Sequence, residues 1–253
     1  MEAVKMKILS IGNSFSQDAQ RWLHSIAVAN GDDLDTYNLV IGGCSLETHW
    51  NCIANNLCNY GKEGNDGQPL GPATVLDTLK SDTFDVITVQ QVSGHSGLAH
   101  TYIPYLIDMV EFIKQYQPNA KLYFHKTWSY DIGSDHSDFK HYNCDQYEMY
   151  RRITDATRMA SKLINADIIP VGDVIQSLRD NTKEFDFKNG GRSLCRDGFH
   201  LSLDYGRFAA AATWYTCFTG KQINLKNFVQ MNPDFDVSLL EVIIGQVNKI
   251  FAK

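Results

Sequence analysis

The stretch MKILSIGNSFS, residues 6–16, decides the fold that we predict for this chain. Its first part, residues 6–12, is mostly apolar and ends at Gly12, as a buried strand does when it leads into a tight turn. Residues 17–30 then carry apolar side chains at helical spacing and stop before Gly31. A strand followed directly by a helix is the repeating unit of an α/β fold.

The same alternation of short β-like runs and longer helical runs continues along the chain. Further strands are expected at residues 34–42, 84–91, 120–128 and 166–172. Further helices are expected at residues 103–116, 145–164, 203–218 and 237–251. Five strands separated by helices predict a parallel sheet with helices on both faces, in a single domain over residues 1–253. The glycine-rich stretch between residues 59 and 73 is expected to be a long surface loop.

Length, charge and hydropathy restrict the class of protein. With 253 residues the chain is long enough for one large domain with a sizeable core. A net charge of −6 argues against a nucleic-acid partner held by a basic surface, and no apolar run reaches the roughly 18 residues of a membrane span. The charged start does not read as a signal peptide, so we expect a cytoplasmic protein, or a periplasmic or secreted one if a leader has been removed.

The cysteine and histidine patterns predict neither a disulfide framework nor a metal centre. The six cysteines lie at positions 44, 52, 58, 144, 195 and 217 without a CxxC pair, and are expected to be buried free thiols. The histidine-bearing run at residues 135–141 fits no strong metal-ligand spacing, so we interpret it as a polar surface loop. We therefore expect no metal ion.

Polar side chains follow several predicted strands, where ligands bind in an open parallel sheet. Ser14 lies between the first strand and the first helix, so its hydroxyl can be exposed there. The alternative is that Asn13, Ser14 or Ser16 only caps the helix. The two glycines of GGCS, residues 42–45, allow backbone N–H groups to approach a ligand, although an ordinary turn would look the same.

Two glutamines end the third strand, and an acid and a histidine lie close together later on. Gln90 and Gln91 follow a buried apolar run, where an amide can donate to an oxyanion or satisfy loose backbone groups. In the stretch RDGFHLS, Gly198 lets the chain bend so that Asp197 can meet Nδ1 of His200. Nε2 would then be free to accept a proton from a serine, although such pairs also merely link a loop to a helix.

Aromatic and histidine side chains near the strand ends are further candidates for a binding cleft. Trp128 and Tyr130, after the fourth strand, could stack on a sugar ring, line an acyl pocket or pack in the core. His49 and Trp50 come shortly after the second strand and could line the same cleft.

Together, these segments resemble the SGNH (GDSL-like) hydrolase superfamily. GNSFS, residues 12–16, is similar to the Gly-Asp-Ser turn of that family's first block, and DGFHLS, residues 197–202, is similar to its Asp-x-x-His block. GGCS matches the glycine block. VQQVS, residues 89–93, resembles a bacterial branch that has Leu-Gln-x-x-Ser in place of Gly-x-Asn-Asp. The resemblance runs in order from residue 7 to about residue 220.

This resemblance implies a flavodoxin-like three-layer α/β/α sandwich with a Ser-His-Asp triad. Ser14 would be the nucleophile, His200 the general base and then acid, and Asp197 the residue that orients the histidine. The oxyanion would be bound by the N–H groups of Ser14 and Gly43 and by the side chain of Gln90, which stands in for the family's asparagine.

The implied chemistry is hydrolysis of a small-molecule ester through an acyl-enzyme, without a metal or an organic cofactor. The aromatic residues and polar loops favour an acylated carbohydrate as the substrate. The possible substrate-binding residues are Gln91, Trp128 and His49. Gln91 is also the alternative to Gln90 as the oxyanion donor. The alternatives are an esterase or thioesterase for lipid acyl chains, and a non-catalytic ligand-binding protein on the same fold.

Overall fold

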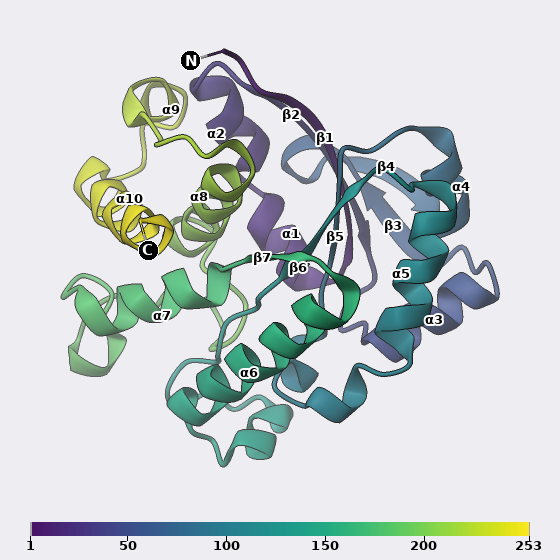
Figure 1. Ribbon diagram of the computed structural model, residues 1–253. Helices are drawn as coiled ribbons and strands as arrows, with labels where there is room; N and C mark the ends of the chain where they lie inside the picture. The colour runs from purple at the N-terminus through teal and green to yellow at the C-terminus, as the bar shows by residue number, and fades with distance from the viewer. Residues whose placement is uncertain (1, 253) are drawn as a thin grey trace.

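A seven-stranded sheet in the order β4-β3-β2-β1-β5-β6-β7 forms the centre of the computed structural model, which describes residues 2–252 (Figure 1). The strands are β1 (Lys5–Gly12), β2 (Asp33–Val40), β3 (Tyr60–Glu63), β4 (Pro69–Ala73), β5 (Val86–Val89), β6 (Lys121–His125) and β7 (Asp167–Ile169). Strands β2, β1, β5, β6 and β7 are parallel, in the 2-1-3-4-5 order of flavodoxin-like folds. The predicted fold class and its five strands are confirmed.

Strands β3 and β4 correct the prediction of a surface loop over residues 59–73. Strand β3 pairs antiparallel with β2, and β4 pairs antiparallel with β3, so the two extend one edge of the sheet. The sequence of β4, PLGPA, is mostly exposed and contains two prolines and a glycine. It lacks both apolar alternation and β-branched residues, the two features that identify a strand in a sequence.

Helices cover both faces of the sheet. They are α1 (Ser14–Gln20), α2 (Leu23–Ala29), α3 (Leu46–Ala54), α4 (Val75–Ser81), α5 (Tyr105–Tyr116), α6 (Gln146–Ile164), α7 (Val171–Asn181), α8 (Tyr205–Thr219), α9 (Leu225–Met231) and α10 (Val237–Phe251). The single helix predicted over residues 17–30 is divided into α1 and α2, with Arg21 and Trp22 between them. Within the described residues, no helix combines the length and apolar character needed to cross a bilayer.

Two apolar clusters form the core, one on each face of the sheet. Ile8 of β1 belongs to the cluster with α1, α2, α7, α8 and α10, whereas its neighbour Leu9 belongs to the cluster with α3, α4 and α5. Successive side chains of a strand point to opposite faces, so β1 contributes to both clusters. Figure 1 shows these two groups of helices on opposite sides of the sheet.

The strand register brings the ends of the central strands into line. Gly12 of β1 pairs with Val40 of β2, and Ile11 pairs with Val89 of β5. The chain segments that follow β1, β2 and β5 therefore leave the sheet on the same side, at the carboxyl ends of the strands. The strand order reverses at β1, and ligands of such sheets bind at this reversal, beyond the carboxyl ends of the strands.

Candidate active site

Ser14 is the first residue of α1, and its hydroxyl is free of any capping role. The cap is Asn13, whose extended backbone (φ −140°) precedes the helix and whose Oδ1 accepts from the N–H of Phe15 at 3.0 Å. Ser16 Oγ donates to the carbonyl of Asn13 at 2.8 Å and lies 2.9 Å from Asn38 Oδ1. Of the three polar residues that could cap the helix, only Asn13 does so.

Ser14, His200 and Asp197 form one continuous chain of hydrogen bonds. Ser14 Oγ lies 2.9 Å from His200 Nε2, and His200 Nδ1 lies 2.7 Å from Asp197 Oδ2. A carboxylate only accepts hydrogen bonds, so Nδ1 carries the proton and Nε2 is the acceptor for the serine hydroxyl. The structure brings together the three residues whose spacing suggested a triad.

The carboxylate of Asp197 is held by the loop that it belongs to. Its Oδ1 accepts from the backbone N–H of His200 at 2.7 Å and of Phe199 at 3.2 Å. Gly198 has a φ of +83°, a left-handed conformation that lets these N–H groups turn back toward the carboxylate. Partial burial pushes the pKa of Asp197 upward, but the hydrogen bonds from His200 and from the backbone outweigh it and set the pKa below its ordinary value.

Trp128 supports the histidine and does not line a cleft, which corrects its prediction as a substrate-binding residue. Its side chain is fully buried and its ring stacks on Phe15, with centroids 4.0 Å apart and planes 3° apart. Its Nε1–H donates to the carbonyl of Phe199 at 2.7 Å, one residue before His200. Phe15 in turn meets the His200 ring edge-on, with centroids 5.9 Å apart. Trp128 therefore holds in place the loop that carries Asp197 and His200.

Asp18 ties the histidine loop to the serine helix, a role that sequence reasoning missed. It lies one helical turn after Ser14, is fully buried, and accepts from the backbone N–H of Leu201 at 2.9 Å. Arg196 Nη1 lies 3.1 Å and Arg207 Nε 2.8 Å from its Oδ1. The sequence carried no clear signal for this role, because Asp18 lies in the mostly polar run SFSQDAQ, where an exposed aspartate would look the same.

A glycine turn after β2 lies beside the start of α1. The N–H of Cys44 donates to the carbonyl of Ile41 at 3.2 Å, and Gly43 has a φ of +63° inside this turn. Asn13 Nδ2 donates to the carbonyl of Cys44 at 3.1 Å, which fixes the turn against the start of α1. Among the residues that the structure describes, no backbone acceptor is found for the N–H groups of Ser14 and Gly43.

The glutamines at the end of β5, of which Gln90 was expected to donate to the oxyanion with Gln91 as the alternative, are buried and already donate side-chain N–H groups within the protein. Gln90 Nε2 donates to Asn13 Oδ1 at 2.8 Å, and Gln90 Oε1 lies 2.8 Å from His125 Nδ1. Gln91 Nε2 lies 3.1 Å from Thr101 Oγ1, and Gln91 Oε1 accepts from the N–H of Leu46 at 3.0 Å. Both side chains are about as inaccessible as the core, at 2% and 1% exposure. Gln90 therefore orients the helix cap beside Ser14, and Gln91 holds the start of α3.

His49 is also placed inside the core, so its prediction as a substrate-binding residue is wrong for this structure. Its ring is completely buried in α3, with Nδ1 2.9 Å from the hydroxyl of Tyr60. Burial lowers the pKa of His49 to about 3, so the ring is neutral at ordinary pH.

The cysteines are free thiols, but not all of them are buried. Cys44, Cys52 and Cys195 are buried, whereas Cys58 and Cys144 are exposed. In the described part of the chain, no group of three or more His, Cys, Asp or Glu side chains is arranged to hold a metal ion.

The fold is shared with solved structures of hydrolases. A candidate SGNH hydrolase from Slackia heliotrinireducens has a TM-score of 0.57 at 19% identity, with 85% of this chain and 99% of that one covered. A lipase/acylhydrolase from Enterococcus faecalis has a TM-score of 0.54 at 13% identity, with 85% and 96% covered. At these identities the likeness shows the fold alone, which is the α/β/α sandwich of the SGNH hydrolases.

The family follows from a closer match. The model of the family described as "Domain of unknown function (DUF4886)" matches residues 7–237. A crystal structure of a DUF4886 family protein from Bacteroides uniformis is 33% identical, with a TM-score of 0.86, and the match covers 98% of this chain and 95% of that one. The chain belongs to the DUF4886 family. No curated protein sequence matches it.

Proposed function

We propose that this protein is a serine esterase that hydrolyses a small ester, with Ser14 as nucleophile, His200 as general base and acid, and Asp197 as the residue that orients the histidine. The observation that carries the proposal is the unbroken hydrogen-bonded chain from Ser14 Oγ through His200 to Asp197. Its position at the strand-order reversal of a flavodoxin-like sheet supports the same conclusion.

Hydrolysis would proceed in two acyl-transfer steps. Ser14 Oγ attacks the ester carbonyl carbon while its proton passes to His200 Nε2. The tetrahedral intermediate then collapses, the bond to the alcohol oxygen breaks, and His200 returns the proton to that oxygen. A water molecule attacks the acyl-enzyme by the same route, so the acid is released and Ser14 regains its proton. Asp197 keeps the histidine in the required tautomer throughout.

The oxyanion hole would be formed by backbone groups. The N–H groups of Ser14 and Gly43 are the proposed donors, since both lack a backbone acceptor among the described residues and Gly43 is exposed in its turn. Gln90 contributes indirectly, because it holds Asn13, which in turn holds the Gly43 turn through the carbonyl of Cys44. One missing donor costs about 3–4 kcal/mol of transition-state stabilisation, so activated esters should be better substrates than unactivated ones.

The alcohol part of the substrate is proposed to be a carbohydrate. A non-catalytic binding protein is the second candidate, and the observation that favours it is the lack of an accessible amide in the place of the family's asparagine. An esterase or thioesterase for lipid acyl chains would use the same triad with a longer acyl group, and a thioesterase would release a thiol in place of an alcohol.

Hydrolysis of p-nitrophenyl acetate separates the esterase from the binding protein. Wild type should turn over, and Ser14→Ala should fall to the background rate. Ser81→Ala is the matched control and should keep full activity. Ser81 is an exposed serine at the end of α4, which leads to the amino end of β5, away from the triad. Equal background rates for wild type and Ser14→Ala would contradict the proposal.

A further inference from the structure

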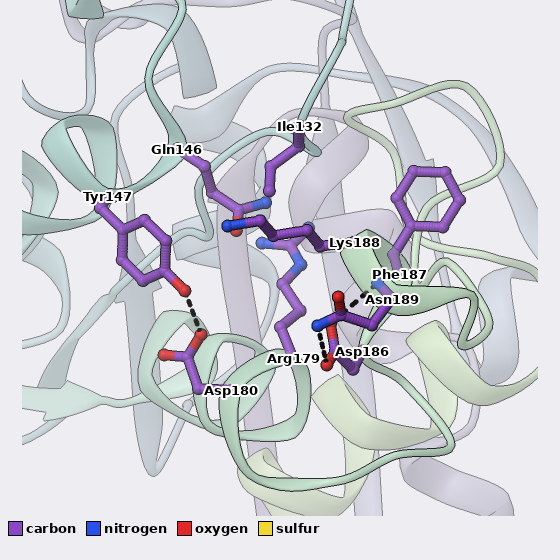
Figure 2. A pocket seen from close by; sticks show the side chains of 9 residues that line it. All are labelled: Ile132, Gln146, Tyr147, Arg179, Asp180, Asp186, Phe187, Lys188 and Asn189. Carbon is purple, nitrogen blue, oxygen red and sulfur yellow. Dashed lines mark hydrogen bonds between the residues drawn. The ribbon is translucent and has the colours of Figure 1, made fainter.

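A surface pocket lies beside the loop after β6, the loop that also contacts Gly198 next to the triad. It is about 230 Å³ in volume and is formed by the loop after β6, the start of α6, the end of α7 and the short 3₁₀ helix η5 (Phe187–Asn189). Its lining residues are Ile132, Gln146, Tyr147, Arg179, Asp180, Asp186, Phe187, Lys188 and Asn189 (Figure 2). Small-molecule pockets usually occupy roughly 300–1,000 Å³, so this hollow is sized for a single ring.

Buried polar groups converge at the centre of this pocket. The guanidinium of Arg179 ends between Gln146 and Lys188 in Figure 2. The Arg179 side chain is 95% buried, and its two Nη groups are bonded to Ser129 and Asp131, but its Nε–H has no partner among the described residues. Because this Nε atom has almost no accessible surface, a ligand in the pocket meets the side chains around it and not the Nε–H itself.

Acceptor groups lie beside this donor. Gln146 Nε2 donates to the carbonyl of Tyr130 at 2.9 Å, which leaves its Oε1 to accept from a ligand. Asp180 Oδ1 accepts from the hydroxyl of Tyr147 at 2.7 Å, and its second oxygen remains available. The pocket thus offers both donors and acceptors, as a ligand with several hydroxyl groups requires.

Two exposed aromatic rings flank the polar centre. Tyr147 and Phe187 stand on opposite sides of the pocket in Figure 2 and are 52% and 46% exposed. Large exposed aromatic faces suit the apolar C–H face of a ring whose edge carries polar groups. Arg179 is neutralised by Asp131, which leaves Lys188 with Asp180 and Asp186 in the lining, so the pocket does not favour an anionic ligand.

The pocket is joined to the triad through one short segment. Asp131, which pairs with Arg179 at 2.5 Å, donates its backbone N–H to the carbonyl of Gly198 at 2.8 Å. Gly198 lies between Asp197 and His200, and Ile132 follows Asp131 directly. Counting along these links at about 3.8 Å per residue puts the rim of the pocket within about 15 Å of His200.

We propose that this pocket binds one sugar ring of a carbohydrate and serves as a remote subsite for the ester cleaved at Ser14. The second half of the inference rests on the proposed esterase function, whereas sugar binding itself does not. Hydroxyl groups of the ring donate to Gln146 Oε1 and to the second carboxylate oxygen of Asp180, and a ring oxygen accepts from the Lys188 ammonium. The C–H faces of the ring lie against Tyr147 and Phe187.

Binding is measured first, on the Ser14→Ala protein, so that no chemistry interferes. Xylotetraose and cellotetraose are each titrated calorimetrically into Ser14→Ala and into the same protein carrying Tyr147→Ala and Phe187→Ala. At least one sugar should bind, and the aromatic pair should weaken it at least tenfold. Phe251→Ala is the control, because Phe251 is an exposed aromatic residue at the end of α10 and should leave the affinity unchanged.

Kinetics then separate this inference from the proposed function. The double variant Tyr147→Ala, Phe187→Ala is then made in protein that keeps Ser14. It should keep kcat/KM for p-nitrophenyl acetate within twofold of wild type. Its KM for acetylated xylotetraose or cellotetraose should rise at least tenfold. Absence of sugar binding to Ser14→Ala, or binding that ignores the aromatic pair, overturns the pocket proposal even if p-nitrophenyl acetate is hydrolysed. Failure of p-nitrophenyl acetate hydrolysis with sugar binding intact overturns the esterase and leaves a sugar-binding pocket.

Discussion

Replacing Asp18 by asparagine should lower kcat strongly while leaving KM almost unchanged. Asp18 touches no substrate in the proposed mechanism, but its carboxylate holds the N–H of Leu201, the residue after His200. It also binds Arg196, the residue before Asp197. Asparagine keeps one acceptor oxygen but turns an N–H₂ group toward the arginines and removes the negative charge. The histidine loop then loses its anchor on the serine helix.

The size of the effect can be worked out from these contacts. Breaking a buried ion pair from one side costs about 3–5 kcal/mol of stability, out of roughly 5–15 kcal/mol for a whole domain. The Arg196 and Arg207 side chains are 32% and 19% exposed, which places the loss toward the lower end. A displacement of about 1 Å at a catalytic group can cost about 100-fold in rate, so kcat should fall by about 10- to 100-fold.

Asp32→Asn is the matched control for this experiment. Asp32 is also a buried aspartate with three partners, accepting from Lys221 at 2.6 Å, from the hydroxyl of Tyr215 at 2.7 Å and from the N–H of Val4 at 2.7 Å. It lies just before β2, at the amino end of this strand, whereas the triad lies beyond the carboxyl ends of the strands. Both variants should unfold at lower urea concentration, but only Asp18→Asn should lose kcat on p-nitrophenyl acetate. Equal kcat values for the two variants would refute the positioning role.

Three further outcomes follow from the same contacts. Asp197→Asn should keep the fold and lower kcat by about 1,000- to 10,000-fold, because an amide no longer fixes the tautomer of the histidine; a loss below tenfold in initial-rate assays would argue against the triad. Gln90→Leu should lower the free energy of unfolding by about 1–3 kcal/mol, because His125 Nδ1 is left unpaired while Asn13 Oδ1 keeps the N–H of Phe15. It should lower kcat less than tenfold, and a fall of 100-fold or more would indicate that Gln90 is an oxyanion donor. In the folded protein His49 has a pKa of about 3 and is neutral, whereas in the unfolded chain it takes up a proton below its ordinary pKa near 6.5. Its contribution to stability is therefore complete above pH 6.5 and is lost as the pH falls toward 3. The free energy of unfolding, measured by urea titration, should therefore decrease less steeply between pH 5.5 and pH 4 in His49→Gln than in wild type, by about 1.4 kcal/mol per pH unit. The same pH dependence in both proteins would contradict the burial of a neutral His49.

The central part of the fold could be predicted because its sequence signals are local. Most of the parallel strands contain a short apolar run, as in Val86–Val89, and a segment with helical periodicity follows. Strand β4 gave no such signal, because an exposed edge strand with two prolines is defined by pairing with its neighbour and not by its own residues.

The triad could be predicted for a different reason. Asp197 and His200 are close in sequence, and Ser14 follows a strand whose end must lie at the ligand-binding edge, so few arrangements were possible. The side chains around them depend on orientation, which the sequence does not contain. Gln90 and Trp128 both follow strands at the correct edge, yet both turn into the core. Asp18 went unrecognised because its partners lie about 180 positions away.

The most direct test of the central claim is covalent labelling with diisopropyl fluorophosphate, followed by peptide mass spectrometry. An activated serine hydroxyl attacks the phosphorus and releases fluoride, so only a serine with a working base reacts quickly. The account predicts a single adduct on Ser14 in wild type and none on Ser14 in His200→Ala. Wild-type protein without an adduct, or with its adduct on another residue, would contradict the assignment of Ser14 as the nucleophile.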